Sequence, residues 1–383
     1  MIEVRNLHAD GVIHSMTAHH IALVVHDFST GGSERIAIRL ANQWAASGRR
    51  VTILCGTEVG SARDLVSPGI EVVSCKPAIH RGWGSRIRLG WKLANLLERY
   101  APDVVFAPGN FHLMVLAVAA RRVTTTRPRF VCKISNPLID RNLPPILRNP
   151  LAWLLRPLLA PIDNMTAMSL LLAKEAQLVL PNRQLTCIDE PILDRRCNAF
   201  RSRAPRDHDP IILCVGRLER QKDFELALRA FAELSPLGRA RLVILGEGPD
   251  RQRLLDIARR LGIAARVDLP GHVSNVSEWI GRARLMLMTS RYEGFPAVLV
   301  EARALGLPVV TTDCSAALPE VISAPCHGEI VDSRAPSDIA GAIQRQLNII
   351  PGSFEQIARG TERFQIESIA PKWLQLFDSA AIR

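Results

Sequence analysis

The sequence lacks the residue clusters that mark metal-binding and redox domains. Its 383 residues include eight cysteines, but no two of them stand in a Cys-x-x-Cys spacing, and no histidine cluster lies beside them. This absence excludes the common zinc and dithiol motifs. Cys55, Cys132 and Cys214 stand inside short apolar runs that read as strands. We therefore expect buried free thiols in a reducing compartment.

Long apolar runs and aromatic residues are also scarce. No stretch of about 18 apolar residues occurs, so the sequence predicts no membrane-spanning helix. The N-terminal segment has no apolar core, which argues against a signal peptide, and residues 1–18 are expected to form a disordered extension. Aromatic residues make up 5% of the chain and only two are tyrosine. Stacking platforms for nucleic acid are therefore few, and no nucleic-acid motif is present.

Positive charge is in excess and is unevenly distributed. The formal net charge is +11. Residues 1–200 carry 24 Lys and Arg against 15 Asp and Glu, a net of +9, whereas residues 201–383 carry 24 against 22, a net of +2. A basic first half favours an anionic partner, such as a membrane face or a phosphorylated substrate. An arginine-rich composition without a function is the alternative.

Alternating strand and helix patterns predict two α/β domains. In the first half, a strand at 21–25 precedes a helix whose apolar residues Ile36, Leu40 and Trp44 share one face, and a second strand follows. A similar series starts near residue 210. We expect a first domain at 19–195, a linker at 196–209 and a second domain at 210–365. A C-terminal helix at about 366–383 is expected to pack back on the first domain.

The sharpest motif is EGFPAVLVE at 293–301, which follows a predicted strand. Pro296 suits the first turn of a helix, so a helix is expected to begin at about 294–297. The backbone N–H groups of a helix N-terminus bind anions, and Gly294 allows a phosphate to come close. Glu293 and Glu301 flank that point. Because carboxylates bind sugar hydroxyls, the pair suggests a ribose and a hexose on either side of a pyrophosphate.

Two further motifs join a predicted strand to a predicted helix. In GRLERQKDF (216–224), Arg217 and Lys222 could both reach one diphosphate. A solvated basic loop is the alternative. In GEGPD (246–250), the glycines could bind a ligand or could simply form a tight turn. The spacing lacks the last glycine of a dinucleotide fingerprint, which makes a nicotinamide site a weak interpretation.

Three motifs, taken in this order, resemble those of the retaining glycosyltransferases of the GT-B fold, and specifically of their large fourth sequence family. The motifs are GRLERQKDF, VILGEGP and SRYEGFPAVLVEARALGLPVV. The resemblance runs from about 21 to 325 and is strongest over 211–325. Gly31 and Gly32 resemble the family's glycine loop in the first domain. The resemblance implies two Rossmann-like doubly wound parallel sheets with a deep cleft between them.

The resemblance also implies a nucleotide-sugar donor bound mainly by the second domain. Arg217 and Lys222 would hold the diphosphate, Glu293 the transferred sugar and Glu301 the ribose. The loop at 271–274 would lie along the base. The remaining donor contacts are expected from Gly31, Gly32, Gly216, Gly246, Gly248, His272, Val273, Gly294, Phe295, Pro296 and Ala297.

The family uses no metal and no cofactor, because cationic side chains and a helix N-terminus take their place. The one Asp-x-Asp spacing, at 207–209, lies in the expected linker. The resemblance implies that the anomeric configuration of the sugar is retained through front-face substitution. In that reaction the leaving phosphate oxygen deprotonates the incoming hydroxyl. His112 or Asn110 would touch the transferred sugar, although a structural histidine is the alternative for His112. Lys133 and Asn136 are expected on the acceptor side.

The expected function is transfer of a sugar to a lipid-linked or polysaccharide acceptor, in the cytoplasm or on the inner face of the cytoplasmic membrane. A UDP-hexose or UDP-N-acetylhexosamine is the first choice of donor, and GDP-mannose is the next. A non-catalytic sugar-nucleotide-binding protein and an anionic-polymer-binding protein are the alternatives. A phosphorylase of this fold has a far longer chain, and an epimerase lacks the EGFPxVxxEA order.

One apolar run in the first half has two interpretations. It is flanked by Arg141, Arg148 and Arg156. Apolar residues beside basic ones suit the interface of an anionic leaflet. An ordinary buried helix of the first core is the other interpretation. The run consists of Trp153, Leu154, Leu155, Leu158 and Leu159.

Overall fold

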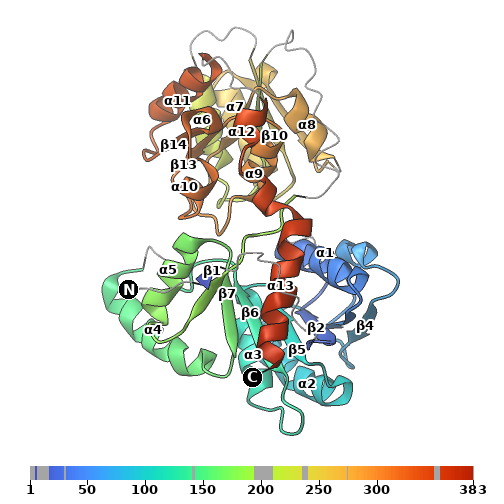
Figure 1. The fold of residues 1–383 in the computed structure, drawn as a ribbon. Helices are drawn as coiled ribbons and strands as arrows, with labels where there is room; N and C mark the ends of the chain where they lie inside the picture. Colours follow the sequence, from blue (N-terminus) through green and yellow to red (C-terminus); the bar gives the residue numbers. More distant parts are fainter. Residues whose placement is uncertain are drawn as a thin grey trace. The chain divides into compact units, whose positions relative to one another are not determined.

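The protein forms two compact units, Met1–Pro191 together with Ile366–Arg383, and Ile192–Gln365 (Figure 1). The structure, a computed structural model, describes residues 5–6, 17–29, 32–139, 143–193, 210–234, 240–273, 275–348 and 354–382. Gly31, Arg141, Ser274 and the expected linker at 196–209 lie outside the described residues. Each unit contains one parallel sheet with helices packed on it, so the predicted pair of Rossmann-like domains is confirmed.

The first unit contains the strands β1 (Arg5–Asn6), β2 (His20–Val25), β3 (Arg50–Cys55), β4 (Glu71–Ser74), β5 (Val104–Ala107), β6 (Arg129–Ile134), β7 (Asn164–Ala167) and β8 (Leu185–Cys187). Their order in the sheet is β1-β8-β7-β6-β5-β2-β3-β4. Ile21 of β2 lies opposite Val51 on one side and Val104 on the other. The order of strands reverses between β2 and β5, and ligands of open α/β sheets bind outside the carboxyl ends at such a point.

The C-terminal helix belongs to the core of the first unit. The helices of this unit are α1 (Gly32–Ala46), α2 (Ser85–Tyr100), α3 (Leu113–Ala120), α4 (Pro145–Leu159), α5 (Leu170–Val179) and α13 (Ile366–Ala381). On α13, the Phe377 ring lies 5.1 Å from that of Trp44, and the Trp373 ring lies 4.7 Å from that of Phe106. All four aromatic side chains are buried. This shared aromatic packing fastens α13 to the sheet.

The second unit contains β9 (Ile211–Val215), β10 (Arg241–Leu245), β11 (Val267–Gly271), β12 (Leu285–Met288), β13 (Val309–Thr312) and β14 (Gly328–Val331). Their order is β11-β10-β9-β12-β13-β14, so the reversal lies between β9 and β12. All four residues of β12 are buried and apolar, as expected of a parallel strand covered on both faces. The helices are α6 (Phe224–Glu233), α7 (Arg251–Arg260), α8 (Val276–Arg282), α9 (Ala297–Ala304), α10 (Leu318–Val321), α11 (Pro336–Asn348) and α12 (Phe354–Ala358).

The expectation of a disordered extension over residues 1–18 is corrected at two places. Arg5 and Asn6 form β1, which pairs in parallel with Thr186 and Cys187 of β8. Without β1, β8 would present the unpaired backbone groups of an edge strand, which readily accept another strand. Thr17 and Ala18 are also held, since both of their N–H groups donate to the Asp378 carboxylate.

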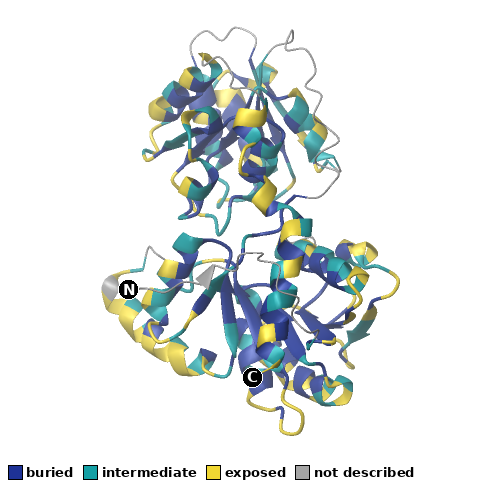
Figure 2. Cartoon of the chain, in the orientation of Figure 1, coloured by how far each residue is buried: buried dark blue, intermediate teal, exposed yellow. Residues whose placement is uncertain are grey.

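The structure shows how far the apolar run at 151–160 is buried. The run forms much of α4, whose side chains are buried at Ala152 and Leu159 but largely exposed at Trp153 and Leu154. Figure 2 shows α4 mostly in the colour of exposed residues. It is therefore not an ordinary buried helix. No helix among the described residues is long and apolar enough to cross a membrane.

Asp378 makes the stability of the first unit depend on pH. Its carboxylate lies 2.7 Å from the Arg49 guanidinium, and both side chains are buried. Burial opposes ionisation, but hydrogen bonds from Arg49, Ala18 and Thr17 outweigh it and lower the pKa of Asp378. A carboxylate whose pKa is lowered by folding stabilises the folded state at pH values above the pKa of an aspartate in the unfolded chain, about 3.9. This stabilisation is lost as the pH falls through the pKa of the folded carboxylate.

We expect Asp378→Asn to lower the free energy of unfolding by about 1.5–3 kcal/mol at pH 7, as the loss of a charged hydrogen-bond partner does. The difference from the parent should shrink below about pH 4, where the unfolded parent chain begins to bind a proton at Asp378, and should be lost as the pH falls through the lowered pKa of the folded carboxylate. Urea unfolding at several pH values measures this. A difference that is the same at pH 7 and at pH 3 would contradict the assignment.

Candidate active site

The topology of the second unit brings Lys222 and Glu293 together. Lys222 lies in the loop after β9, and Glu293 lies in the loop after β12. These strands are neighbours at the point where the strand order reverses, so their carboxyl ends meet at one edge. Lys222 Nζ lies 2.5 Å from Glu293 Oε1, which also accepts a hydrogen bond of 2.6 Å from the Ser290 hydroxyl. The site is thus a charged pair at the expected ligand edge.

The pair is partly open to solvent. The Lys222 side chain is 21% exposed and that of Glu293 is 11% exposed. The backbone of Glu293 is held by a hydrogen bond from its N–H to the Cys314 carbonyl, at 2.7 Å. An ammonium group and a carboxylate are therefore held in fixed places while both can still meet a ligand. The ammonium suits a phosphate, and the carboxylate suits sugar hydroxyls.

Arg217 does not join this pair in the structure. Its side chain is 74% exposed, and its guanidinium lies 3.0 Å from the Glu219 carboxylate. An exposed pair of this kind contributes little to stability and opens easily. A role for Arg217 on the diphosphate therefore remains a prediction.

The glycines of GEGPD have a packing role of their own. A Cβ atom on Gly246 would lie 1.9 Å from the Gly216 carbonyl oxygen, and one on Gly248 would lie 2.4 Å from that of Leu218. Gly246 also has a φ of +138°, a backbone conformation that residues other than glycine rarely adopt. The two loops run backbone to backbone, and the Leu218 N–H donates to the Glu247 carbonyl at 2.9 Å. This packing is enough to require glycine, and a ligand role for Gly246 and Gly248 stays a prediction.

The predicted helix start is observed at α9, which begins at Ala297. Pro296 is the residue just before the helix rather than in its first turn. The Gly294 carbonyl accepts a hydrogen bond from Ser315, and the Phe295 ring packs against Phe364 at 5.6 Å. Glu301 lies just over one turn into α9 and is half-buried. His272 and Val273 follow β11, two strands away from β9, with His272 exposed and Val273 half-buried.

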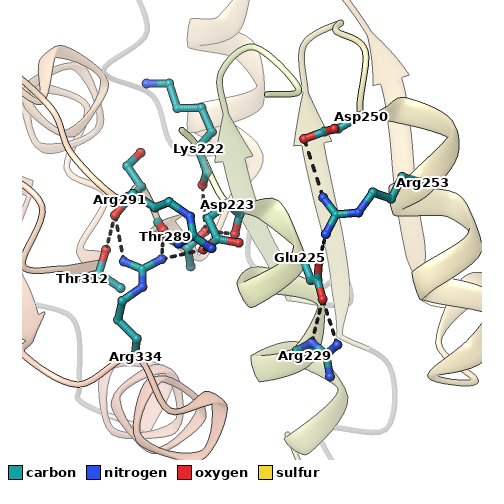
Figure 3. A network of polar contacts seen from close by, with 11 residues as sticks. Lys222, Asp223, Glu225, Arg229, Asp250, Arg253, Thr289, Arg291, Thr312 and Arg334 are labelled. Carbon is teal, nitrogen blue, oxygen red and sulfur yellow. Dashed lines mark hydrogen bonds and ion pairs between the residues drawn. The ribbon is translucent and has the colours of Figure 1, made fainter. Parts of the chain in front are cut away.

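Sequence reasoning missed the polar residues that join the two loops of the site (Figure 3). The Asp223 carboxylate lies 2.7 Å from the guanidinium groups of both Arg291 and Arg334. The Thr289 hydroxyl donates to the carbonyls of Lys222 and Asp223, at 3.2 and 3.0 Å. The sequence could have pointed to Asp223 as a residue of the site, because it adjoins Lys222. Nothing in the sequence pointed to Arg334, because it stands 111 residues beyond Asp223 along the chain.

In the first unit, His112 lies after β5, beside the reversal point. Its side chain is 1% exposed, and burial, followed by the charge of Arg81, lowers its pKa to about 3. Neither ring nitrogen has a hydrogen-bond partner among the described residues. His112 is therefore neutral, and its imidazole is a buried polar group that lacks a partner, which is uncommon in native proteins.

The predicted acceptor-side residues are engaged within the first unit. The Asn110 side chain accepts from the Ser135 N–H and donates to the Asn136 carbonyl, both at 2.8 Å. Lys133 Nζ lies 2.6 and 2.7 Å from the two carboxylate oxygens of Glu190, and both side chains are buried. Asn136 is exposed and Gly32 opens α1. The ammonium of Lys133 is thus occupied by an internal ion pair.

A second charged cluster near His112 was also missed. Arg81 donates to Asp27 and to Glu34, at 2.5 and 2.9 Å. Its guanidinium also lies 4.6 Å from the centre of the Phe111 ring. Burial opposes the shift, but the hydrogen bonds from Arg81 and Ser29 lower the pKa of Asp27 to about 2. Asp27 and Arg81 follow β2 and β4, so only the folded sheet brings them together.

Among the residues that the structure describes, no group of three or more His, Cys, Asp or Glu side chains is placed to hold a metal ion. The cationic groups near the Lys222–Glu293 pair are side chains of the chain itself, at Lys222, Arg291 and Arg334.

Comparisons with known proteins show which family the chain is similar to. The family model described as "Glycosyl transferase 4-like domain" matches residues 31–188, and the one described as "Glycosyl transferases group 1" matches residues 196–351. A lipopolysaccharide 1,6-galactosyltransferase of Salmonella typhimurium is 33% identical over 165 residues, which span 39% of this chain and 45% of that protein. An N-acetyl-alpha-D-glucosaminyl L-malate synthase of Bacillus anthracis is 25% identical over 84% of this chain and 85% of its own length.

Solved structures show the same fold. A glycosyltransferase of Rickettsia africae matches with a TM-score of 0.74 at 16% identity, covering 94% of this chain and 98% of that one. The lipopolysaccharide outer core galactosyltransferase WaaB, in its apo form, matches with a TM-score of 0.71 at 19% identity, covering 95% and 99%. HepE of Anabaena, in complex with UDP and glucose, matches with a TM-score of 0.71 at 18% identity, covering 94% and 99%. Two family models that together span most of the chain, and a shared two-domain fold, show that this chain belongs to the GT-B glycosyltransferases.

Proposed function

We propose that the protein transfers a sugar from a nucleotide sugar, foremost a UDP-hexose or UDP-N-acetylhexosamine, to a lipid-linked or polysaccharide acceptor. The observation that carries the proposal is the Lys222–Glu293 pair at the reversal point of the second sheet. The structure of HepE is described as a complex with UDP and glucose, and that of WaaB as an outer core galactosyltransferase. The first description supports a UDP-sugar donor, and the second supports a cell-surface glycan as acceptor.

The residues of the second unit have distinct parts in this proposal. The Lys222 ammonium offsets the charge that develops on the departing diphosphate, and the Glu293 carboxylate accepts hydrogen bonds from the sugar hydroxyls. Glu301 holds the ribose from inside α9, while the α9 N-terminus faces the phosphates. When the donor binds, the Arg217 guanidinium leaves its ion pair with Glu219 and contacts the diphosphate.

The reaction proceeds with retention and without a metal ion. The bond between the anomeric carbon and the diphosphate oxygen breaks, and its electron pair stays on the phosphate. The acceptor oxygen bonds to the same face of the sugar, and its proton passes to the leaving phosphate oxygen. The protein contributes positioning and charge stabilisation. A contact between His112 and the transferred sugar stays a prediction of the sequence, since both ring nitrogens of His112 are buried in the first unit.

Nucleotide binding tests this proposal directly. We expect UDP to raise the unfolding temperature more than GDP, ADP or TDP, because a ligand that binds only the folded state stabilises it. Glu301→Gln should reduce the UDP-induced shift, whereas Glu293→Gln should keep the shift and lower the release of UDP from a UDP-sugar. If no nucleotide changes the unfolding temperature, the proposal fails. A UDP shift without any release of UDP from UDP-sugars would instead favour the non-catalytic alternative.

We further propose that the first unit associates with an anionic membrane surface through α4. On this helix, Ile146 is 80% and Trp153 is 73% exposed, and Arg156 is exposed one turn beyond Trp153. Eleven of the twelve large apolar side chains that are exposed among the described residues belong to the first unit, the exception being Tyr292. Exposed aromatic and aliphatic residues beside arginine suit the boundary between lipid headgroups and acyl chains.

Vesicle flotation tests the membrane association. The parent should float with vesicles that contain anionic lipid and should be released by salt, because surface charge is screened within about 8 Å at physiological ionic strength. The double variant Trp153→Ser, Leu154→Ser should float several-fold less. Leu65→Ser, which changes an exposed apolar residue elsewhere in the first unit, serves as the matched control. Equal flotation of parent and double variant would contradict the role of α4.

A further inference from the structure

The residue that follows Lys222 has an unusual backbone. Asp223 has a φ of +46°, and Ala101 is the one other residue besides glycine with a positive φ in the described part of the chain. Such a conformation costs free energy and persists only where the surroundings hold it. Aspartate tolerates it better than most residues. The chain therefore turns sharply just after the lysine that the proposed function places on the diphosphate.

Contacts from distant parts of the chain hold this turn. The Asp223 carboxylate binds Arg291, which follows β12, and Arg334, which follows β14. The Thr289 hydroxyl donates to the carbonyls of Lys222 and Asp223. Asp223 thus ties the β9 loop both to the β12 loop and to the β14 loop (Figure 3).

Arg334 holds the other side of the site as well. Its guanidinium donates to the Ser290 carbonyl at 3.1 Å and to the Thr289 carbonyl at 3.0 Å. The same guanidinium donates to the Asp223 carboxylate at 2.7 Å. The Thr312 hydroxyl, at the end of β13, adds a hydrogen bond of 2.8 Å to the Ser290 carbonyl. Arg334 therefore holds the backbone at Thr289 and Ser290, just before Glu293, and the carboxylate of Asp223, just after Lys222.

We propose that Asp223 and Arg334 are positioning residues that set the distance between Lys222 and Glu293. This inference rests on the proposed function of that pair. Neither residue needs to touch the substrate, because each acts through the backbone to which a reacting group is attached. A displacement of about 1 Å at a reacting group can cost on the order of 10²-fold in rate. The proposed function assigns the nucleoside to Glu301 and the 271–273 loop, and assigns Lys222 to the charge that develops on the departing diphosphate, so turnover should depend on the network more than UDP affinity does.

The experiment measures UDP binding and turnover separately. The probe is whichever of UDP-glucose, UDP-galactose and UDP-N-acetylglucosamine raises the unfolding temperature of the parent most, and turnover is the release of UDP with water as the acceptor. Arg334→Ala should lower kcat by about 10–10²-fold while the Kd for UDP changes less than about 3-fold. Arg334→Lys keeps the charge but loses the forked geometry, so it should recover part of the rate. Arg345→Ala, which changes an exposed arginine of α11 that pairs with Glu329, should match the parent.

Two aspartate variants separate the carboxylate from the backbone. Asp223→Gly removes the carboxylate and suits the positive φ, so a role in backbone conformation alone predicts turnover equal to that of the parent. We expect instead a loss similar to that of Asp223→Ala. The double variant Asp223→Ala, Arg334→Ala should be no slower than Arg334→Ala, because the two residues act as one unit.

The outcomes distinguish the inference from the proposed function. If the parent neither binds UDP nor releases it from a UDP-sugar, the proposed function fails and the positioning role fails with it. If the parent turns over and Arg334→Ala retains its kcat within about 2-fold, the positioning role alone is wrong. A parallel loss of UDP affinity and kcat in Arg334→Ala, with no recovery in Arg334→Lys, would also overturn it in favour of a purely structural arginine.

Discussion

The Lys222→Ala variant is expected to lose transfer activity by about 10²–10³-fold and to remain folded. The loss follows from the removal of one preorganised charge contact to the departing diphosphate. The effect on stability should be small, about 1–2 kcal/mol at most, because Glu293 keeps its hydrogen bond from Ser290. Turnover with a UDP-sugar and urea unfolding measure the two effects.

Arg229→Ala is the matched control for Lys222→Ala. Arg229 lies on α6, the helix that follows the same loop, and it forms an exposed pair with Glu225 one turn away. Such pairs contribute only about 0.3–0.5 kcal/mol, so both activity and stability should stay close to the parent values. A Lys222→Ala variant that transfers sugar as fast as the Arg229→Ala control would remove Lys222 from the reaction.

The second large effect concerns the buried pair of Lys133 and Glu190. Lys133→Ala should destabilise the protein by about 3–5 kcal/mol, because it leaves the Glu190 carboxylate buried without its partner. Glu190 stands at the end of the first segment of the first unit, which closes at Pro191. The ion pair therefore anchors the point at which the chain leaves that unit.

A double variant separates this structural role from the expected contact with an acceptor. Replacing a buried ion pair by apolar residues of similar volume is often close to neutral, so Lys133→Met together with Glu190→Leu should regain most of the stability. If that double variant also transfers sugar at the parent rate, the role of Lys133 is to anchor the chain. If it is stable but loses activity or acceptor affinity, Lys133 acts on the acceptor as the sequence predicted.

The sequence by itself determined the two parallel α/β sheets and the local form of the site. Apolar runs such as IALVV and IILCV predict buried strands, and helical spacing predicts α1 and α6, because these signals lie within a few residues of each other. The segment EGFPAVLVE predicts a helix start at 294–297, and α9 begins at Ala297. Strand β1 carries no comparable local signal, since it depends on its pairing with β8, far along the chain.

Only the tertiary structure decided how the charged groups pair. The sequence placed Lys222 with Arg217 on a phosphate and Glu293 on a sugar, whereas the folded sheet brings Lys222 against Glu293 and leaves Arg217 exposed. The sequence also predicted that Lys133 contacts the acceptor, whereas in the folded protein Lys133 forms an ion pair with Glu190. Local patterns specify which loops end at the carboxyl edge of a sheet. The order of the strands specifies which loops are neighbours, and that order is set by packing between segments up to more than a hundred residues apart, as for Asp223 and Arg334.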